Sequence, residues 1–122
     1  MRIFKTKSFS RLAGKARITD TDLLVAADEV NRGEYEADLG GEVFKKRIAR
    51  SGAGKAGGFR AILFFRKDER LFYTYVFAKS DRGNIEDDEL RDFKKAARAY
   101  LKFTDKELTA LIEAGKIKEI GL

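Results

Sequence analysis

The stretch FRAILFFRKDERLFYTYVFAK, residues 59–79, carries the strongest indication of the fold. Phe59–Arg66 and Leu71–Lys79 are rich in aromatic and β-branched residues, which are typical of strands. The polar run Lys67–Arg70 between them is so short that the two strands must be hairpin partners. We therefore expect this hairpin at the centre of a β-sheet.

The register of the hairpin brings two distant cations together. With a loop of either two or four residues, Arg60 lies opposite Phe77 and Lys79 lies opposite Gly58. Arg60 and Lys79 are then diagonal neighbours on one face, about 7–8 Å apart between backbones, and both can reach one phosphate. The same register places Ile62, Phe64, Tyr73 and Tyr75 beside these cations and, on the opposite face, which is the better core for helices, Phe59, Ala61, Leu63, Phe65, Phe72, Thr74, Val76 and Ala78. A one-residue bulge would change this assignment.

Signals on both sides of the hairpin predict the remaining elements. Thr19 or Asp20 caps a helix with an acidic first turn, and Gly33 ends it. Thr104 and Glu107 form a capping-box pattern at the start of a last short helix. The expected elements are a strand at 2–6, a helical turn at 8–14, helices at 19–33, 86–103 and 104–114, a strand at 42–50 and a connector at 34–41. Nothing resembles a linker, so we expect a single domain over residues 1–122.

The composition excludes several classes of protein. The chain has no Cys and no His, which removes disulfides, thiolate metal sites, the usual zinc ligand and the usual acid or base of neutral pH. Any catalysis then uses Lys, Arg, Tyr, Glu, Asp or Ser, and we expect no metal and no cofactor. The N-terminus lacks the apolar run of a signal peptide, and no stretch is apolar enough to span a membrane. We expect a cytoplasmic protein.

A basic block at Val43–Lys67 indicates the kind of partner. It holds eight Lys or Arg and no Asp or Glu, whereas the rest of the chain holds 18 basic against 20 acidic residues. The formal charge of +6 is therefore a local excess. Such an excess is typical of a surface that meets a polyanion.

Each of these charges also has an explanation that needs no ligand. The cations of the 42–50 strand are equally consistent with a solvated edge strand, where charge blocks further sheet pairing. Arg60 stands among apolar residues, so it is either paired with an acid such as Glu42 or Asp81 or lines a functional groove. Tyr73 and Tyr75 are either packing residues or platforms on which bases stack.

The Gly-rich segment Ser51–Gly58 resembles a phosphate-binding loop only superficially. A P-loop needs GxxxxGK followed by Ser or Thr and a helix, whereas Ala56 follows Lys55 here and a strand comes next. We expect a flexible loop between two antiparallel strands. Lys55 at its tip would add a mobile cation over bound nucleic acid.

Four segments of the sequence, taken together, resemble a known family. They are ADLGG at 37–41, KKRIAR at 45–50, GKAGGFR at 54–60 and FAKSDRGNI at 77–85. From about residue 1 to 120 the chain resembles the RelE-like toxins of bacterial toxin–antitoxin pairs, in the branch close to the HigB type. The resemblance implies an α+β fold, a RelE-like domain in which helices pack on one face of a twisted, mainly antiparallel sheet.

The resemblance also implies a function. Such toxins are mRNA endonucleases that cut codons on translating ribosomes, and a small antitoxin binds and silences each of them. The expected partners are a cognate antitoxin, mRNA and ribosomal RNA, with no membrane. The catalytic cations of the family correspond to Arg60 and Lys79. The cations expected to bind RNA are Lys45, Lys46, Arg47, Arg50, Lys55 and Arg82.

The implied chemistry works without His. Attack of the 2′-OH on the adjacent phosphorus gives a cyclic phosphate and needs no metal, but the charge on the phosphate oxygens must be neutralised. The guanidinium fork of Arg60 matches two phosphate oxygens, and Lys79 is the expected proton-transfer residue, because neighbouring cations make an ammonium a better proton donor. Glu86 stands where some relatives carry a Tyr, so the general base stays open.

Two other functions fit the same sequence. ParE-type relatives inhibit DNA gyrase by protein contact. The cations on the sheet of this chain favour RNA cleavage over that activity. A non-catalytic RNA-binding module would need no more than the basic strip.

Overall fold

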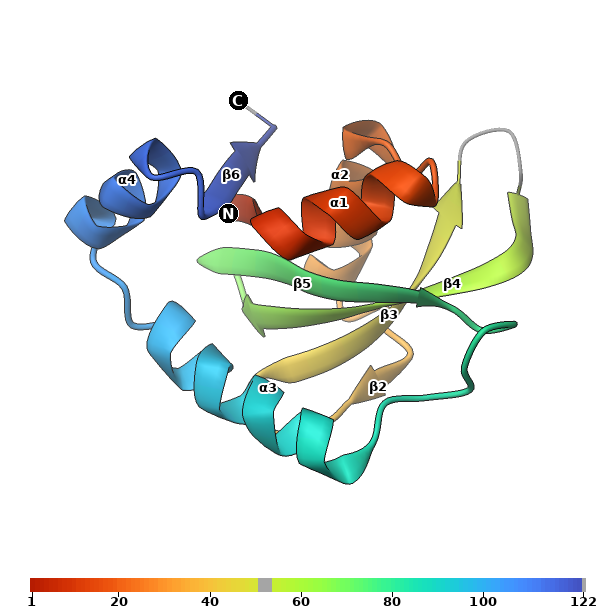
Figure 1. Cartoon of the computed structure of the whole chain (residues 1–122). Helices are drawn as coiled ribbons and strands as arrows, with labels where there is room; N and C mark the ends of the chain where they lie inside the picture. Colours follow the sequence, from red (N-terminus) through yellow and green to blue (C-terminus); the bar gives the residue numbers. More distant parts are fainter. Residues whose placement is uncertain (51–53, 122) are drawn as a thin grey trace.

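Six strands form one twisted sheet in the order β2-β3-β4-β5-β1-β6 (Figure 1). This computed structural model describes residues 1–50 and 54–121, without the side chains of residue 50 and residues 54–57. The elements are β1 (Arg2–Thr6), α1 (Lys7–Lys15), α2 (Asp20–Asn31), β2 (Ala37–Asp38), β3 (Val43–Arg50), β4 (Gly54–Arg66), β5 (Arg70–Ala78), α3 (Asp87–Tyr100), α4 (Asp105–Glu113) and β6 (Ile117–Ile120). Neighbouring strands are antiparallel, except that β1 and β5 are parallel. The α+β class and the mainly antiparallel sheet are confirmed.

Helices cover both faces of the sheet, and not one face as expected (Figure 1). One core cluster joins Phe9 of α1 and Leu23 of α2 to the sheet, and a second joins Ala97 of α3 and Leu108 of α4 to its other face. The reason lies in β4, whose residues 61–65 are all apolar and all buried. Because successive side chains of a strand point to opposite faces, such a strand needs cover on both.

The β4–β5 hairpin contains a turn and a bulge that differ from the expectation. Its turn is the three-residue segment 67–69, with Asp68 in the left-handed region at φ 63°. The register shifts by one residue after Ile62, so that Thr74 is an extra residue on β5. The Thr74 hydroxyl donates to the Ile62 carbonyl at 2.8 Å, which stabilises the bulge.

The three-residue turn shifts the register of the hairpin by one residue, and the bulge at Thr74 shifts it back. The half of the hairpin beyond Thr74 therefore has the expected pairing. There Arg60 lies opposite Phe77, and the Lys79 N–H donates to the Gly58 carbonyl at 2.8 Å, both as expected. Near the turn, however, the odd loop length reverses the two faces of β5 relative to the expectation. The predicted faces of Phe72 and Tyr73 are therefore wrong, because Phe72 packs with α3 and α4 and Tyr73 packs with α1 and α2.

Tyr73 is consequently a core residue and not a platform for bases. Its side chain is fully buried, its ring stacks on Phe9 with 5.2 Å between centroids, and its hydroxyl donates to the Leu23 carbonyl at 2.7 Å. Burial raises the pKa of the Tyr73 hydroxyl far above its ordinary value. The hydroxyl therefore remains a protonated hydrogen-bond donor.

The expected helix starts are confirmed by their caps. Thr19 accepts the Asp22 N–H at 3.1 Å, and the Asp22 carboxylate accepts the Thr19 N–H at 2.9 Å. Thr104 and Glu107 form the same reciprocal pair at the start of α4. These capping boxes satisfy backbone donors that have no partner within the helix.

Three stretches of strand were not expected. β2 lies within the predicted connector, and β6 pairs antiparallel with the outer edge of β1. β4 begins at Gly54, so the predicted loop is wrong for residues 54–58, and its residues 51–53 lie outside the described part of the chain. Short strands at a sheet edge form through their pairing partners, which local sequence does not reveal.

An ion pair between Arg2 and Glu119 ties β6 to β1. Arg2 donates from Nε and Nη2 to the Glu119 carboxylate at 2.8 and 2.9 Å. These hydrogen bonds lower the pKa of Glu119 below its ordinary value. A carboxylate with a lowered folded-state pKa stabilises the fold above its unfolded pKa, and the contribution is lost as the pH falls through the folded value.

We expect Glu119→Gln to lower the free energy of unfolding at neutral pH by about 1 kcal/mol, because Arg2 loses a charged partner in a pair that water partly screens. The difference from the wild type is expected to disappear below about pH 3, where the wild-type carboxylate is protonated as well. Urea denaturation across this pH range measures both effects. Glu113→Gln is the matched control, since Glu113 lies on α4 without an ion pair among the described residues. A difference that persists at low pH would contradict the assignment.

Candidate functional site

Arg60 and Lys79 meet at Gly58, as the register of the hairpin predicts. Gly58 has φ +45°, and a β-carbon at this position would lie 3.4 Å from Arg60 Nη1 and 3.6 Å from Lys79 Cβ. The two cations come from β4 and from the end of β5, and both flank the same glycine. The backbone pairing therefore brings the two residues to neighbouring positions at one end of the sheet.

Arg60 is a buried and paired cation. Its side chain is 8% exposed, and its Nε donates to both carboxylate oxygens of Glu36, at 2.9 and 2.8 Å. Its Nη1 reaches the Phe59 carbonyl at 3.4 Å, whereas Nη2 has no hydrogen-bond partner in the described part of the chain. Glu36 therefore binds the Nε side of the guanidinium, and Nη1 lies toward Gly58.

Lys45 joins the site from β3. Its Nζ lies 3.4 Å from Glu36 Oε1 and donates a long hydrogen bond to Asn84 Oδ1 at 3.5 Å. Asn84 belongs to the segment that follows β5, so this contact brings that segment back toward β3. The carboxylate of Glu36 thus bridges Lys45 on β3 and Arg60 on β4.

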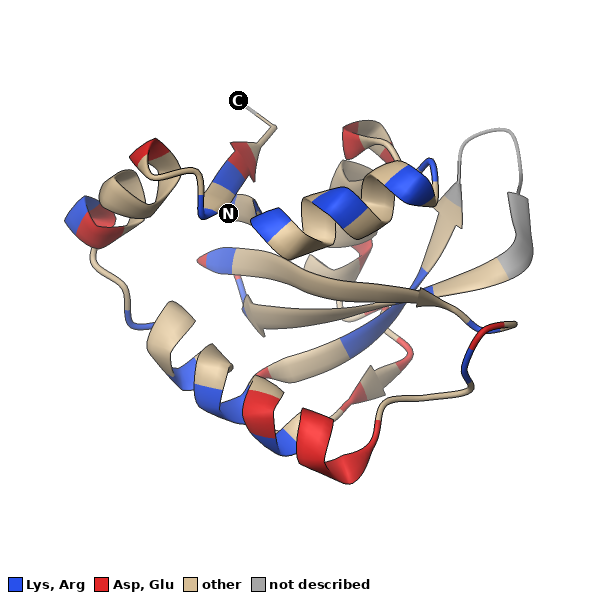
Figure 2. Cartoon of the chain, in the orientation of Figure 1, with Lys and Arg blue, Asp and Glu red and all other residues tan. Residues whose placement is uncertain are grey.

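Arg82 lies in the same segment and is held by several partners. Its guanidinium donates to the Glu89 carboxylate at 3.0 Å, to the Tyr75 hydroxyl at 3.2 Å and to the Asn84 carbonyl at 2.9 Å. It also lies over the rings of Tyr75 and Phe77. The hydrogen bonds with Glu89 raise the pKa of Arg82 and lower the pKa of Glu89. Arg82 therefore fixes this segment against the acidic start of α3 (Figure 2).

The remaining predicted cations lie in different places. Arg47 is exposed and stands opposite Arg60 in the β3–β4 register, so it shares the face of the site. Lys46 belongs to the opposite face, where its side chain is nearly buried and its Nζ donates to the Glu34 carbonyl at 2.8 Å and lies 3.1 Å from the Glu29 carboxylate. The side chains of Arg50 and Lys55 lie outside the described residues.

Acids from outside the basic block neutralise much of it. The pairs are Lys45–Glu36, Lys46–Glu29, Arg60–Glu36 and Arg66–Glu42. Neither Glu42 nor Asp81, the acids suggested by the sequence, pairs with Arg60. Sequence reasoning missed Glu36, because 24 residues separate it from Arg60 and its pairing depends on how β2 docks on β3.

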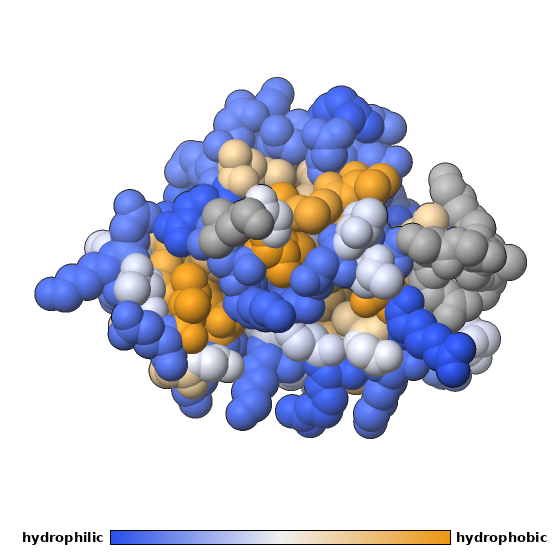
Figure 3. All heavy atoms as spheres, turned by 90° about the horizontal axis from the view of Figure 1, so that it is seen from above, coloured by the Kyte–Doolittle hydropathy of each residue, from blue (hydrophilic) through white to orange (hydrophobic). Residues whose placement is uncertain are grey.

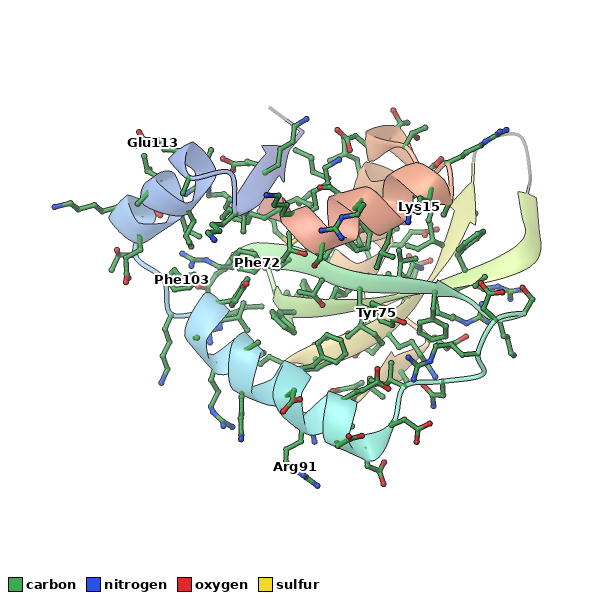
Figure 4. The ribbon with its side chains drawn as sticks, viewed as in Figure 1. Lys15, Phe72, Tyr75, Arg91, Phe103 and Glu113 are labelled. Carbon is green, nitrogen blue, oxygen red and sulfur yellow. The ribbon has the colours of Figure 1, made fainter. Side chains whose placement is uncertain are left out.

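A cleft of about 390 Å³ lies beside the site, between α1 and the end of β5. Its lining residues are Leu12, Lys15, Ala16, Phe59, Tyr75, Val76, Phe77, Ala78, Asp81 and Arg82. Figure 4 labels Lys15 and Tyr75, which lie on its two walls, and Figure 3 shows hydrophobic patches among hydrophilic side chains on the side of α1. This volume is within the range of small-ligand sites.

Residues 1–50 and 54–121 contain neither a cluster of possible metal ligands nor a helix that could span a membrane. No group of three or more His, Cys, Asp or Glu residues there could hold a metal ion. None of the helices in this part of the chain has the length and apolar character that crossing a membrane requires.

The sheet and its basic hairpin are consistent with a RelE-like domain. Over residues 1–120 the chain matches the family model of the RelE toxin of the RelE/RelB toxin–antitoxin system. The chain therefore belongs to the RelE toxin family. Among curated proteins, none matches the chain significantly.

We expect Gly58→Ala to lower the free energy of unfolding by about 1–2 kcal/mol, because an L-residue is strained in the left-handed region that Gly58 occupies. The added methyl group meets Arg60 and Lys79 at ordinary contact distances, so strain and not a clash causes the loss. Urea denaturation measures it. Gly83→Ala is the matched control, because Gly83 lacks a positive φ and a β-carbon there meets nothing within 4 Å. Equal losses in both variants would contradict the explanation.

Proposed function

We propose that this chain is the toxin of a type II toxin–antitoxin pair and acts as a ribosome-dependent mRNA endonuclease. The observation that supports this most directly is that Arg60 and Lys79 flank Gly58, since the resemblance to RelE-like toxins implies that the same two residues are the catalytic cations. The proposal treats residues 1–122 as one toxin domain, close to the HigB branch, that acts in the cytoplasm.

The proposed reaction is a transfer within the RNA. The 2′-oxygen attacks the adjacent phosphorus and loses its proton, the bond from phosphorus to the 5′-oxygen breaks, and a 2′,3′-cyclic phosphate forms. Arg60 neutralises the phosphate oxygens through its guanidinium, whose fork of N–H donors matches two oxygens. Lys79 donates a proton to the departing 5′-oxygen.

The other cations serve binding in this proposal. Arg47 and Lys45 share the face of Arg60 and hold the RNA backbone beside the site, and Arg50 and Lys55 extend the same basic strip. Lys46 has no such role here, because its ammonium is bound on the other face. Arg82 acts on RNA only indirectly, by fixing the segment that carries Asn84.

The ribosome and an antitoxin complete the set of proposed partners. Family membership implies an antitoxin. A site built from Arg and Lys without an assigned base is weak on free RNA, so ribosomal RNA supplies the positioning of the message. Contact of the basic strip with ribosomal RNA phosphates is what the net charge of +6 favours.

We expect Arg60→Ala and Lys79→Ala each to reduce codon-phased mRNA cleavage by about a hundredfold or more, because each removes stabilisation of charge or a proton transfer in the transition state. Primer extension on messages after induction measures the cuts. Arg91→Ala is the matched control for the lost charge, since Arg91 is exposed on α3 and points away from the sheet (Figure 4). Thermal unfolding of each variant checks that it is folded.

Each alternative function predicts a different result in the same experiment. Growth arrest with intact RNA and blocked DNA supercoiling would identify a gyrase inhibitor. Binding of RNA without any cuts would identify a binding module. Cleavage that persists in both variants would contradict the roles of Arg60 and Lys79.

We expect Arg47→Ala to affect RNA binding and Lys46→Ala to affect folding stability. Arg47→Ala weakens RNA binding and lowers the slope of log affinity against log salt by about 0.7 for single-stranded RNA, because one phosphate contact is lost. Lys46→Ala leaves this slope unchanged and lowers the free energy of unfolding by about 1–2 kcal/mol, because the Glu34 carbonyl and Glu29 lose their partner. Fluorescence anisotropy at several salt concentrations and urea denaturation measure the two effects. Equal salt slopes for both variants would contradict the separation.

A further inference from the structure

We propose that Glu36 is the internal counter-ion of the RNA site, which an RNA phosphate displaces when it binds Arg60. The inference rests on the proposed RNA function and concerns the state of the site before RNA arrives. Glu36 lies just before the two-residue strand β2, outside the basic block and outside the hairpin. No residue from this segment was among the predicted site residues.

The Glu36 carboxylate already occupies the place of a phosphate. Both of its oxygens lie within 2.9 Å of Arg60 Nε, and Oε1 lies 3.4 Å from Lys45 Nζ. A phosphate group of RNA carries the same sign of charge and presents the same kind of oxygen to these donors. One carboxylate thus neutralises two cations, on two neighbouring strands, that would otherwise bind RNA.

The exposure of these side chains shows which of them RNA meets first. The Glu36 side chain is 33% exposed, whereas those of Lys45 and Arg60 are 15% and 8% exposed. The carboxylate is therefore the most exposed of the three charged groups, and the guanidinium that it pairs with is the least exposed. Competition with Glu36, and not merely with water, sets the affinity of Arg60 for RNA.

Arg60 needs an anion as long as RNA is absent. A nearly buried cation without a partner strongly destabilises a fold, so Glu36 stabilises the free protein. The same contact weakens RNA binding, because the pair must be separated first. Loss of the Glu36 charge therefore has opposite effects on folding stability and on RNA affinity.

Release of Arg60 needs only side-chain rotation. The Glu36 backbone N–H donates to the Lys45 carbonyl at 2.9 Å, and the next residue, Ala37, pairs with Lys45 in the β2–β3 ladder. These backbone bonds hold Glu36 in place. Its carboxylate can leave Arg60 by rotation about side-chain bonds, without movement of β2.

The test compares Glu36→Gln with Glu34→Gln. Glu34 is exposed, lies two residues away and pairs with Arg32, so its substitution removes the same charge without touching Arg60. The probe is a single-stranded 2′-O-methyl RNA, which lacks the attacking hydroxyl and is not cut. We expect Glu36→Gln to bind it about three- to tenfold more tightly than the wild type, while Glu34→Gln changes affinity less than about twofold. Urea denaturation is expected to show that Glu36→Gln is the less stable variant.

Three results would overturn the inference. Equal gains in both variants would show a general charge effect, and weaker binding by Glu36→Gln would show that Glu36 supports the site and does not compete for it. A gain by Glu36→Gln that is undiminished in an Arg60→Ala background would show that Arg60 is not what Glu36 occupies, since freeing Lys45 alone accounts for only part of the gain. If instead Arg60→Ala and the wild type bind the RNA equally, Arg60 does not bind RNA and the proposed function of Arg60 is wrong. This outcome is distinct from the three above, in which only the role of Glu36 is wrong.

A spectroscopic measurement keeps the inference testable if Glu36→Gln folds poorly. In the wild type, the Nε–H resonance of Arg60 is expected to shift as the RNA is added, because its acceptor changes from a carboxylate to a phosphate. Glu36→Asp keeps the charge but shortens the side chain, which weakens the bond to Nε–H, so its free-state resonance is expected to differ from that of the wild type. An Arg60 Nε–H resonance that stays constant on RNA binding would overturn the proposed exchange.

Discussion

The pairing of β4 with β5 is the constraint on which both core layers and the candidate site depend. Residues 61–65 of β4 are apolar and buried at every position, so the hairpin requires helices on both faces. The bulge at Thr74 offsets the odd length of the turn, which returns Lys79 to the position opposite Gly58. Without that bulge a shift of one residue would put Lys79 on the other face from Arg60. Core and site are therefore determined by the same register.

Charge pairing divides the basic block into parts that do different things. Lys46 and Arg66 are bound to acids and carbonyls and hold the sheet to its surroundings. Arg60 shares Glu36 with Lys45 in the candidate site, and Arg47 stands exposed beside them. A run of cations in a sequence is thus a poor measure of the free positive surface, because acids far away in the chain can return to neutralise it.

The proposed counter-ion would give the site a property expected of an enzyme that acts only on the ribosome. In the free protein Arg60 is nearly buried and paired with Glu36. A strong polyanion such as a ribosome-bound message would have to separate the pair before Arg60 could act. The proposed dependence on the ribosome and the proposed role of Glu36 are therefore compatible, since both make the isolated protein weak on free RNA.

The sequence by itself determined the two central strands and the helix starts at Thr19 and Thr104, because each depends on near neighbours in the chain. The meeting of Arg60 with Lys79 was predicted, but it depends on the bulge at Thr74, which offsets the three-residue turn. Tertiary structure decided the rest. The bulge, the second helical layer, β6 and the pairing of Arg60 with Glu36 all depend on contacts between residues far apart in the chain. Such contacts are selected by packing and by the need to neutralise buried charge, and these act only once the chain is folded.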